Sequence, residues 1–219
     1  MNQRIQILFL VALGLFSLAA LPANAKTLKD IVPAHYAGQG MPALSQMTLV
    51  STDPAHDHKT DHLDILADHF AFSDARFYAA IRNRGGGFPT SARLGSVYYS
   101  YMVVIANLAD DDVIWALTYI RVPLAGLKPG LYRIGGMDAK DLVRIGDIDY
   151  QIDPASNLLK MSCKISSLLS DPLFAAWYKP GNPSFGLGST TNKTTVIPYK
   201  TSSPDTTYPG ARIIPVISD

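Results

Sequence analysis

The chain has 219 residues, a formal net charge of +1 at pH 7 and 17% charged residues. A charge this close to zero gives no electrostatic basis for binding nucleic acid or an anionic membrane. The hydrophobic content of 47% is typical of a packed globular protein and excludes a disordered chain. All 18 acidic residues are aspartate, which favours turns and metal-binding loops over helix interiors.

The first 25 residues have the features of a bacterial export signal. Arg4 precedes an apolar run from Ile5 to Leu21, and Ala23-Asn24-Ala25 fits the small-x-small pattern of a cleavage site. We therefore expect cleavage after Ala25 and a secreted or periplasmic location. The remaining residues, 26–219, are expected to form one domain with no membrane span. An uncleaved membrane anchor is the alternative, although the run is short for a span.

Short apolar segments separated by turn residues make up most of residues 26–219. Their alternating pattern predicts strands over residues 47–51, 63–72, 76–83, 97–108, 113–122, 131–134, 142–145, 147–153, 158–165 and 211–217. In the second of these strands, Leu63, Ile65, Ala67, His69 and Ala71 are expected to share one face.

Few segments have a helical pattern. Ser166–Trp177 is the best candidate for a short, serine-capped helix. Asp110-Asp111-Asp112 is expected to form a solvated turn between the two longest strands, and the Gly-rich residues 84–87 a hairpin tip. Pro215 places the last predicted strand at a sheet edge. The predicted fold class is all-β, an antiparallel, jelly-roll-like β-sandwich with one short helix.

Cys163 is the only cysteine, so an exported form of this chain has no intrachain disulfide. It alternates with Leu159, Met161 and Ile165 at strand period. We therefore expect a small buried core residue, and a reactive thiol is the less favoured alternative.

Two segments carry a resemblance to a known group of domains. The first contains Asp53-Pro54, Leu63-Asp64-Ile65 and the stretch from Ser73 to Ile81, and the second is Leu158–Leu169. This order of an Asp-Pro loop, an LDI strand, an SD-x-x-x-Y-x-x-I hairpin and a later strand with a short helix resembles the DOMON-like and family 9 carbohydrate-binding-module sandwiches. The resemblance spans residues 53–177, and its motifs describe a fold more than an activity.

The resemblance implies a secreted module that binds sugar, haem or metal. The family's sugar-stacking tryptophans have no clear counterpart in Trp115 or Trp177. A haem module of this type would use a Met/His pair, for which this chain offers Met102 with His69 or with a loop histidine.

The loop before residue 63 holds the sharpest candidate site. His56-x-His58-x3-His62 offers imidazoles with a spacing that suits Zn²⁺ or Cu²⁺. Asp57, Asp61 and Asp64 would be further ligands or would orient the rings. The ordinary alternative is a solvated loop whose Asp and His side chains make turn contacts.

A second interpretation assigns Ca²⁺ to Asp53, Asp57, Asp61 and Asp64, although the loop lacks the Asp-x-Asp-x-Asp-Gly pattern. The metallo-β-lactamase motif is excluded, because the spacing has one residue too many and no histidine follows His69.

Aromatic side chains give a separate candidate site. Trp115, Tyr99 and Tyr101 lie on predicted strands, where exposed rings would stack on a carbohydrate. Core packing explains the same rings equally well. His69 is read as a core histidine rather than a ligand.

The sequence contains no nucleophile elbow and no recognisable Ser/His/Asp set. We therefore expect a secreted or periplasmic binding module for a carbohydrate or a metal ion, rather than an enzyme. The alternatives are a small metal-dependent or Asp-based hydrolase acting on polysaccharide and a structural protein of the cell envelope.

Overall fold

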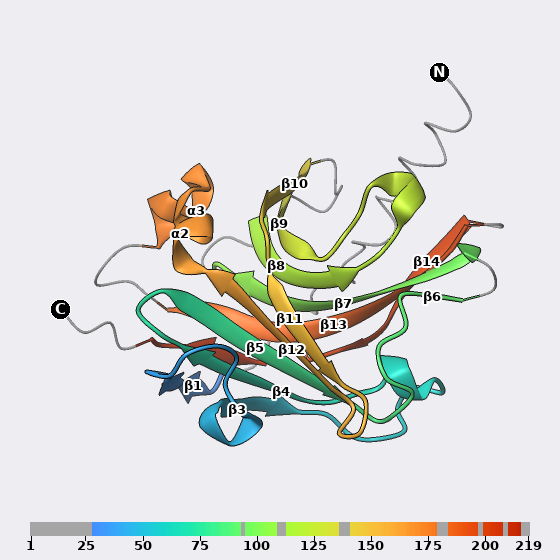
Figure 1. Ribbon diagram of the computed structural model, residues 1–219, viewed down its shortest axis with the longest axis horizontal. Coiled ribbons are helices and arrows are strands. Elements are labelled where there is room, and N and C mark those ends of the chain that lie inside the picture. The colour runs from blue at the N-terminus through green and yellow to red at the C-terminus, as the bar shows by residue number, and fades with distance from the viewer. Residues whose placement is uncertain are drawn as a thin grey trace.

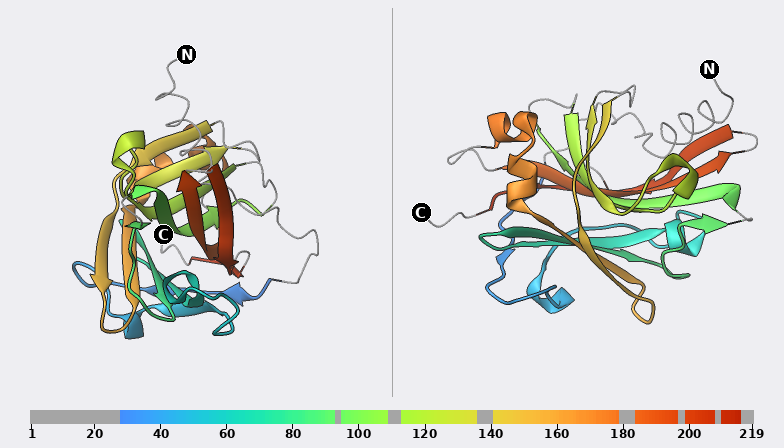
Figure 2. Two further views of the ribbon diagram at one scale, coloured as in Figure 1. Left: turned by 90° about the vertical axis from the view of Figure 1, so that its right-hand side faces the viewer. Right: turned by 45° about the horizontal axis from the view of Figure 1, so that its top comes forward.

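The computed structural model describes residues 28–92, 95–108, 113–135, 141–178, 184–196, 199–207 and 210–215. The predicted export signal and the Asp110–Asp112 turn lie outside these ranges. Two β-sheets pack face to face in the described part of the chain (Figures 1 and 2). The prediction of an all-β sandwich is confirmed. Among the described residues, no helix is both long enough and apolar enough to cross a membrane.

The larger sheet has nine strands in the order β1-β15-β13-β7-β8-β9-β10, with β14 paired to β13 and β6 paired to β7. These strands are β1 (Asp30–Ile31), β6 (Ser91–Ala92), β7 (Val97–Ala106), β8 (Val113–Ile120), β9 (Gly130–Gly135), β10 (Asp141–Gly146), β13 (Phe185–Val196), β14 (Tyr199–Thr206) and β15 (Ala211–Ile213). The pairing of β1 with β15 is parallel, and the other pairs in this sheet are antiparallel.

The smaller sheet has six strands in the order β11-β12-β5-β4-β2, with β3 paired to β4. They are β2 (Ala34–His35), β3 (Thr48–Thr52), β4 (Ile65–Phe72), β5 (Arg76–Asn83), β11 (Asp149–Asp153) and β12 (Leu158–Lys164). Only the short β2–β4 pairing is parallel among the described strands of this sheet.

The main core fills the space between the two sheets. Tyr101 and Val103 of β7, Trp115 of β8, Phe77 of β5 and Cys163 of β12 all belong to this one buried cluster. Cys163 is fully buried, as the sequence predicted, and burial raises the pKa of its thiol to about 12. Such a thiol stays protonated and unreactive at neutral pH.

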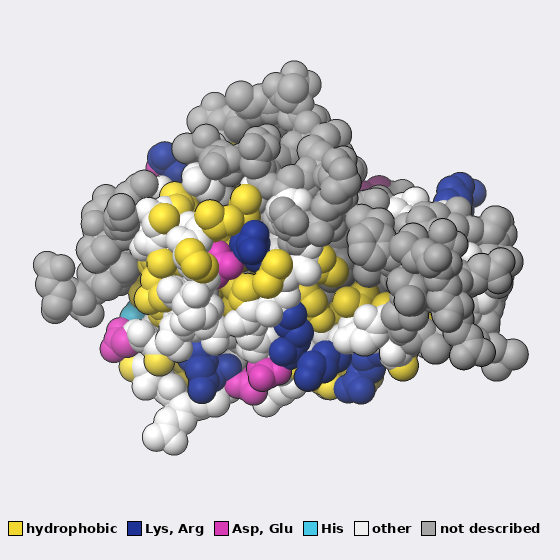
Figure 3. All heavy atoms as spheres, turned by 90° about the horizontal axis from the view of Figure 1, so that it is seen from above, with side chains coloured by type: hydrophobic (Ala, Val, Ile, Leu, Met, Phe, Trp, Pro, Cys, Tyr) yellow, Lys and Arg dark blue, Asp and Glu magenta, His cyan; other side chains and the backbone are white. Residues whose placement is uncertain are grey.

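The predicted helix is divided into two pieces, α2 (Ile165–Leu169) and α3 (Pro172–Trp177). The division occurs because Asp171 caps α3: its carboxylate accepts hydrogen bonds from the N–H groups of Leu173 and Phe174, both at 3.1 Å. Lys164, rather than a serine, occupies the N-cap of α2. Hydrophobic side chains gather over these helices in the view from above (Figure 3), and Leu169 and Leu173 are exposed there.

The prediction of which β4 side chains point toward the core is correct only for the first residues of the strand. The pairing of β4 with β5 shifts register between Ile65 and Ala67, which is a β-bulge. A shift of one residue exchanges the two faces of a strand. As a result Phe70 packs in the core between the sheets, whereas His69 lies on the outer side. Asp68 is turned inward, where it is fully buried.

The C-terminal part of the chain forms more structure than predicted. The strands β13 and β14 fall in a Ser/Thr/Gly/Pro-rich tail for which no strand was expected, and β13 lies between β7 and β15 near the middle of its sheet. The prediction that the last strand occupies a sheet edge is also wrong. β15 lies between β1 and β13, and Pro215 follows the strand instead of interrupting it.

Candidate metal site

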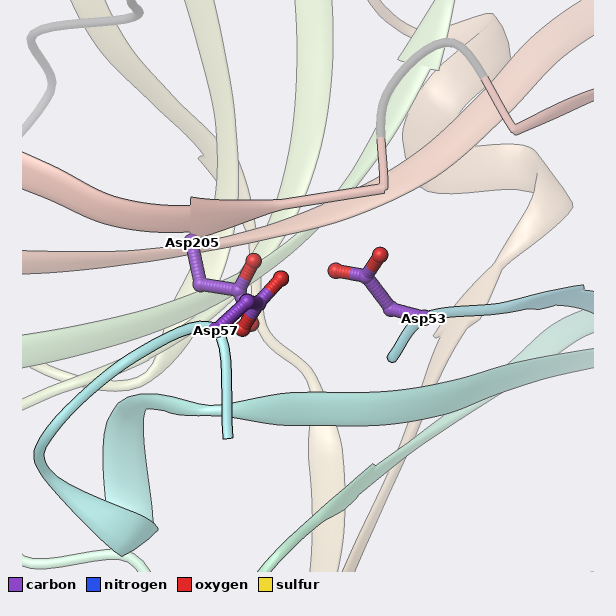
Figure 4. A group of neighbouring side chains, drawn as sticks. All are labelled: Asp53, Asp57 and Asp205. Atoms are coloured by element: carbon purple, nitrogen blue, oxygen red, sulfur yellow. The ribbon is translucent and has the colours of Figure 1, made fainter. Parts of the chain in front are cut away.

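Three aspartates from separate parts of the chain meet where β3 ends beside β14. Asp53 directly follows β3, Asp57 lies in the loop after it, and Asp205 lies near the end of β14. One carboxylate oxygen from each lies within 4.8 Å of those of the other two. Figure 4 shows the Asp57 and Asp205 carboxyl groups against each other, with the Asp53 carboxyl pointing toward them. Asp205 is buried, Asp53 is half-buried and Asp57 is exposed.

Backbone contacts between the two sheets hold Asp205 in place. The N–H of Ile65, the first residue of β4, donates to Asp205 Oδ2 at 2.5 Å. On the neighbouring strand β13, the Thr191 hydroxyl donates to the Leu63 carbonyl at 2.9 Å. These contacts join β13 and β14 of the larger sheet to the start of β4 in the smaller one. The site therefore lies at a fixed junction between the sheets.

Two of the three carboxyl groups, those of Asp53 and Asp205, have raised pKa values. Burial, a hydrogen bond with Asp53 and the charges of Asp53 and Asp57 together raise the pKa of Asp205 to about 7. Burial is also the main reason that the pKa of Asp53 is raised, and the charges of Asp57, Asp64 and Asp68 add to it. A positive charge placed among these groups would relieve the repulsion.

Arg84, which contacts the loop between β3 and β4, is engaged with carboxylates outside this group. Arg84 forms ion pairs with Asp61 and, at 2.6 Å, with the fully buried Asp64. Asp64 Oδ2 also accepts the His56 N–H at 2.9 Å, while Asp64 Oδ1 is buried without a hydrogen-bond partner in the described part of the chain. No ion pair recorded among the described residues includes Asp53, Asp57 or Asp205. Within the described part of the chain, no recorded ion pair therefore neutralises the three-carboxylate cluster.

The three loop histidines do not form one ligand set. His56 Nδ1 lies 2.6 Å from Arg84, His58 Nδ1 accepts the Thr60 N–H at 3.0 Å, and His62 Nδ1 lies 2.8 Å from the Tyr101 hydroxyl. Burial lowers the pKa of His62 to about 4, so this ring is neutral at pH 7. None of these histidines belongs to the group of converging ligand atoms found among the described residues.

Of the six residues predicted for a transition metal, only Asp57 therefore lies in that group. The calcium interpretation is closer, because both Asp53 and Asp57 take part. Asp61 and Asp64 are directed to Arg84 instead.

The predicted carbohydrate contacts are core residues. Trp115, Tyr99 and Tyr101 are 2%, 8% and 0% exposed. The Trp115 ring stacks on Trp177 with centroids 5.3 Å apart, and its N–H donates to Asp171 at 3.3 Å. Rings buried in this way present no free face to a sugar.

The suggested pair of His69 and Met102 is also separated. Met102 points away from the core on β7 of the larger sheet, and His69 does so on β4 of the smaller one. The two side chains lie on opposite outer surfaces of the sandwich and cannot ligate one haem.

Sequence reasoning missed Asp205. It stands in the segment Ser202-Ser203-Pro204-Asp205-Thr206, which carries no ligand spacing of its own. Only the pairing of β14 with β13 brings it to the loop that follows β3. A signal for this residue would have required the strand order, which local periodicity does not contain.

In comparisons with known proteins, no family model matches this chain and no curated protein matches it.

Proposed function

We propose that the mature chain is a secreted or periplasmic β-sandwich binding module that holds a Ca²⁺ ion with Asp53, Asp57 and Asp205. The convergence of three carboxylates carries this proposal. Ca²⁺ takes oxygen ligands at about 2.3–2.6 Å, so oxygens on opposite sides of one ion lie about 5 Å apart. A separation within 4.8 Å fits that geometry. The absence of imidazole or thiolate from the group favours Ca²⁺ over Zn²⁺ or Cu²⁺.

Electrostatics supports the same proposal. Asp53 and Asp205 share a hydrogen bond, and burial together with neighbouring carboxylates raises the pKa of both. A bound cation would take the place of the proton shared by the pair.

A cation at this position would fasten the β3–β4 loop to β14. Asp53 and Asp57 belong to the side of the smaller sheet, whereas Asp205 belongs to the larger sheet. We therefore assign the ion a role in ordering this end of the sandwich, where the loop would present the module's binding surface. The resemblance to DOMON-like and family 9 modules remains part of this proposal, and the two-sheet architecture supports it.

Calcium titration of residues 26–219, purified through a chelator, tests the proposal. We expect stoichiometric Ca²⁺ binding by calorimetry and a rise in the unfolding temperature. Asp57→Asn should weaken binding by about tenfold or more, because it removes one charged ligand. Asp74→Asn is the matched control, since Asp74 is exposed and pairs with His35 instead. A wild-type chain that shows no calorimetric Ca²⁺ binding contradicts the proposal.

The pairing of Asp53 with Asp205 also favours a second candidate function. Acid–base hydrolysis of glycosides uses two neighbouring carboxyl groups, one of them with a raised pKa, and Asp205 beside Asp53 offers these two residue types. Release of reducing sugar from a polysaccharide panel, abolished in Asp205→Asn without added Ca²⁺, would favour the hydrolase over the binding module.

A further inference from the structure

A groove runs along the outer side of the smaller sheet, where β11 and β12 form its floor. The side chains of Tyr150, Ile152 and Met161 belong to the main core or pack against it, so the alternate residues of both strands point outward. Strand pairing sets these outward residues opposite one another: Asp149 with Ser162, Gln151 with Lys160 and Asp153 with Leu158. The floor of the groove therefore consists mostly of polar side chains.

The segment between β2 and β3 forms one wall of the groove. The residues of this wall are Gly40, Met41, Ala43 and Leu44. Two hollows lie between the wall and the floor, with volumes of about 280 Å³ near Asp149 and about 680 Å³ near Asp153. Gln151 lines both hollows, so they are parts of one groove. The Lys160 ammonium group donates to the Pro42 carbonyl at 3.0 Å, which holds the wall against the sheet.

Hydrogen-bonding groups of both kinds are spaced along the groove. At one end, Arg76 of β5 donates to Ser162 Oγ at 2.8 Å and forms an ion pair with the exposed Asp149. Its Nη1 has no hydrogen bond recorded among the described residues. In the middle, Gln151 is exposed, and within the described ranges its side-chain amide has no recorded partner either. Asp153 adds a carboxylate at the other end.

The charges along the groove cancel. Arg76 and Asp149 line the smaller hollow, and Lys160 and Asp153 line the larger one, so each hollow has one charge of each sign. A charged ligand would meet a like charge in either hollow. A neutral ligand rich in hydroxyl groups meets no such repulsion, and each hydroxyl both donates and accepts hydrogen bonds. The groove therefore suits a neutral molecule with many hydroxyl groups.

The wider end of the groove lies at the same end of the sheet as the three-carboxylate cluster. In the strand register, Asp153 pairs with Leu158, Leu158 with Arg82, Arg82 with Ala67, and Ala67 with Thr52. Asp53 of the cluster directly follows Thr52. Four strand spacings of about 4.8 Å place the two regions about 19 Å apart. The groove and the cluster are therefore separate surfaces at one end of the protein.

We propose that this groove binds a neutral oligosaccharide. Four residues of β11 at about 3.3 Å each give it a length of about 13 Å, which exceeds one sugar ring and suits a short chain of them. Met41 and Leu44 supply apolar surface for the C–H faces of the rings. An extended peptide would instead add to the backbone at a strand edge, whereas the polar groups of the groove stand on the side-chain face of β11.

The inference rests on the proposed function, because it names a ligand for the binding module, but no residue of the groove belongs to the three-carboxylate cluster. The two proposals can therefore fail separately. A protein that binds sugar in the groove but no Ca²⁺ supports this inference and contradicts the calcium site. A protein that binds Ca²⁺ but no neutral sugar overturns this inference alone.

Titration of the ¹⁵N-labelled protein with neutral tetrasaccharides of glucose, mannose, xylose or N-acetylglucosamine tests the proposal, with Ca²⁺ held constant. Oligogalacturonate and an unstructured peptide are the charged and peptide comparisons. We expect at least one neutral sugar to shift the amide signals of residues 149–153 and 158–162 in a saturable manner. This measurement on the unmodified chain does not depend on the folding of a variant. If no neutral sugar shifts these signals, or only the comparison ligands do, the proposal is overturned.

Gln151→Ala should weaken the binding of that sugar by about fivefold, because it removes a donor and an acceptor from the middle of the groove. Its stability should hardly change, since Gln151 is exposed. Leu49→Ala is the control and should bind normally, because Leu49 is 46% exposed on β3, on the other side of β4 and β5 from the groove floor. An unchanged affinity in Gln151→Ala overturns the assignment of the ligand to this groove.

Discussion

Asp205 and Ile65 lie 140 positions apart in the chain, yet the Ile65 N–H donates a hydrogen bond to the Asp205 carboxylate at 2.5 Å. This contact joins the last long strand of the larger sheet to the first residue of β4 in the smaller sheet. It also fixes the carboxylate that Asp53 and Asp57 approach. The candidate site and the junction of the two sheets therefore share an atom, so changes to one will affect the other.

The cation-free protein should lose stability as the pH rises from about 4 to about 7. The pKa of Asp205 is about 7 in the folded state, against its ordinary value of 3.8 in the unfolded chain. The folded state thus binds more protons than the unfolded state in this range, and the free energy of unfolding falls with increasing pH. Urea unfolding in the presence of a chelator, at several pH values within this range, measures the effect.

The Asp205→Asn variant isolates that contribution. His62 acts in the opposite direction, because its lowered pKa of about 4 makes stability rise between about pH 4 and 6.5. The difference between wild type and Asp205→Asn removes this background. A difference that does not change with pH would show that Asp205 titrates normally.

Substitution of Asp68 by alanine should destabilise the protein by about 3 kcal/mol. Its Oδ1 accepts hydrogen bonds from the Ser51 N–H and hydroxyl, at 2.8 and 2.6 Å. Its Oδ2 accepts the hydroxyls of Ser189 and Thr207, at 3.0 and 2.6 Å. Asp68→Ala leaves these donors buried without an acceptor. Chemical denaturation measures the loss, and Asp74→Ala at an exposed position should change stability by less than about 0.5 kcal/mol.

Removal of the Arg84 charge should destabilise the protein strongly, because it leaves the buried Asp64 carboxylate unpaired. The double variant Arg84→Met with Asp64→Asn should recover a large part of that loss, since no buried charge then remains. A double-mutant cycle on unfolding free energies tests this coupling. Additive losses would show that Asp64 does not depend on Arg84 for its neutralisation.

Trp115→Phe should lower stability by about 1–3 kcal/mol. The change removes the N–H that donates to Asp171 and weakens the stacking on Trp177. Leu173→Ala serves as the control and should be nearly neutral, because the Leu173 side chain is exposed. A stable Trp115→Phe protein that has lost retention on glycan arrays would restore this residue as a ligand contact.

Local sequence patterns predicted the strands of the first two thirds of the chain well. The predicted hairpin strand, residues 76–83, matches β5 (Arg76–Asn83) at both ends. Apolar alternation is strong there, because the inward side of β5 packs in the main core. The same reasoning exchanged the inward and outward sides of the later part of β4. A bulge there inserts one residue, and the hydrophobic pattern does not reveal it.

The strand β13 shows a second reason why hydrophobic periodicity fails to predict a strand. Its sequence, FGLGSTTNKTTV, has an apolar start and a polar remainder, yet all but its last few residues are buried. The Ser189 and Thr191 hydroxyls are satisfied by Asp68 and by the Leu63 carbonyl. Burial of polar residues through such distant partners depends on the tertiary fold, so periodicity could not have revealed it.

Only two of the three residues of the candidate site were predictable from the sequence. Asp53 and Asp57 stand out in a loop rich in Asp and His. Asp205 and the engagement of His62 with Tyr101 come from strand pairing across the sandwich. The histidine spacing predicted that the three rings bind one metal ion, because that prediction assumes an extended loop. In the structure, a 3-10 helix over Asp61–Leu63 changes the direction of the chain at the end of the loop.

The position of β13 constrains the order in which this protein can fold. Its neighbours β7 and β15 are contributed by residues 97–106 and 211–213, so the larger sheet cannot be completed until almost the whole chain is available. Pairing across such sequence separations makes folding slow and leaves the β7 edge open in the interim. The strands β13, β14 and β15, contributed by residues 185–213, are therefore the last strands that the larger sheet can gain as the chain is made from its N-terminus.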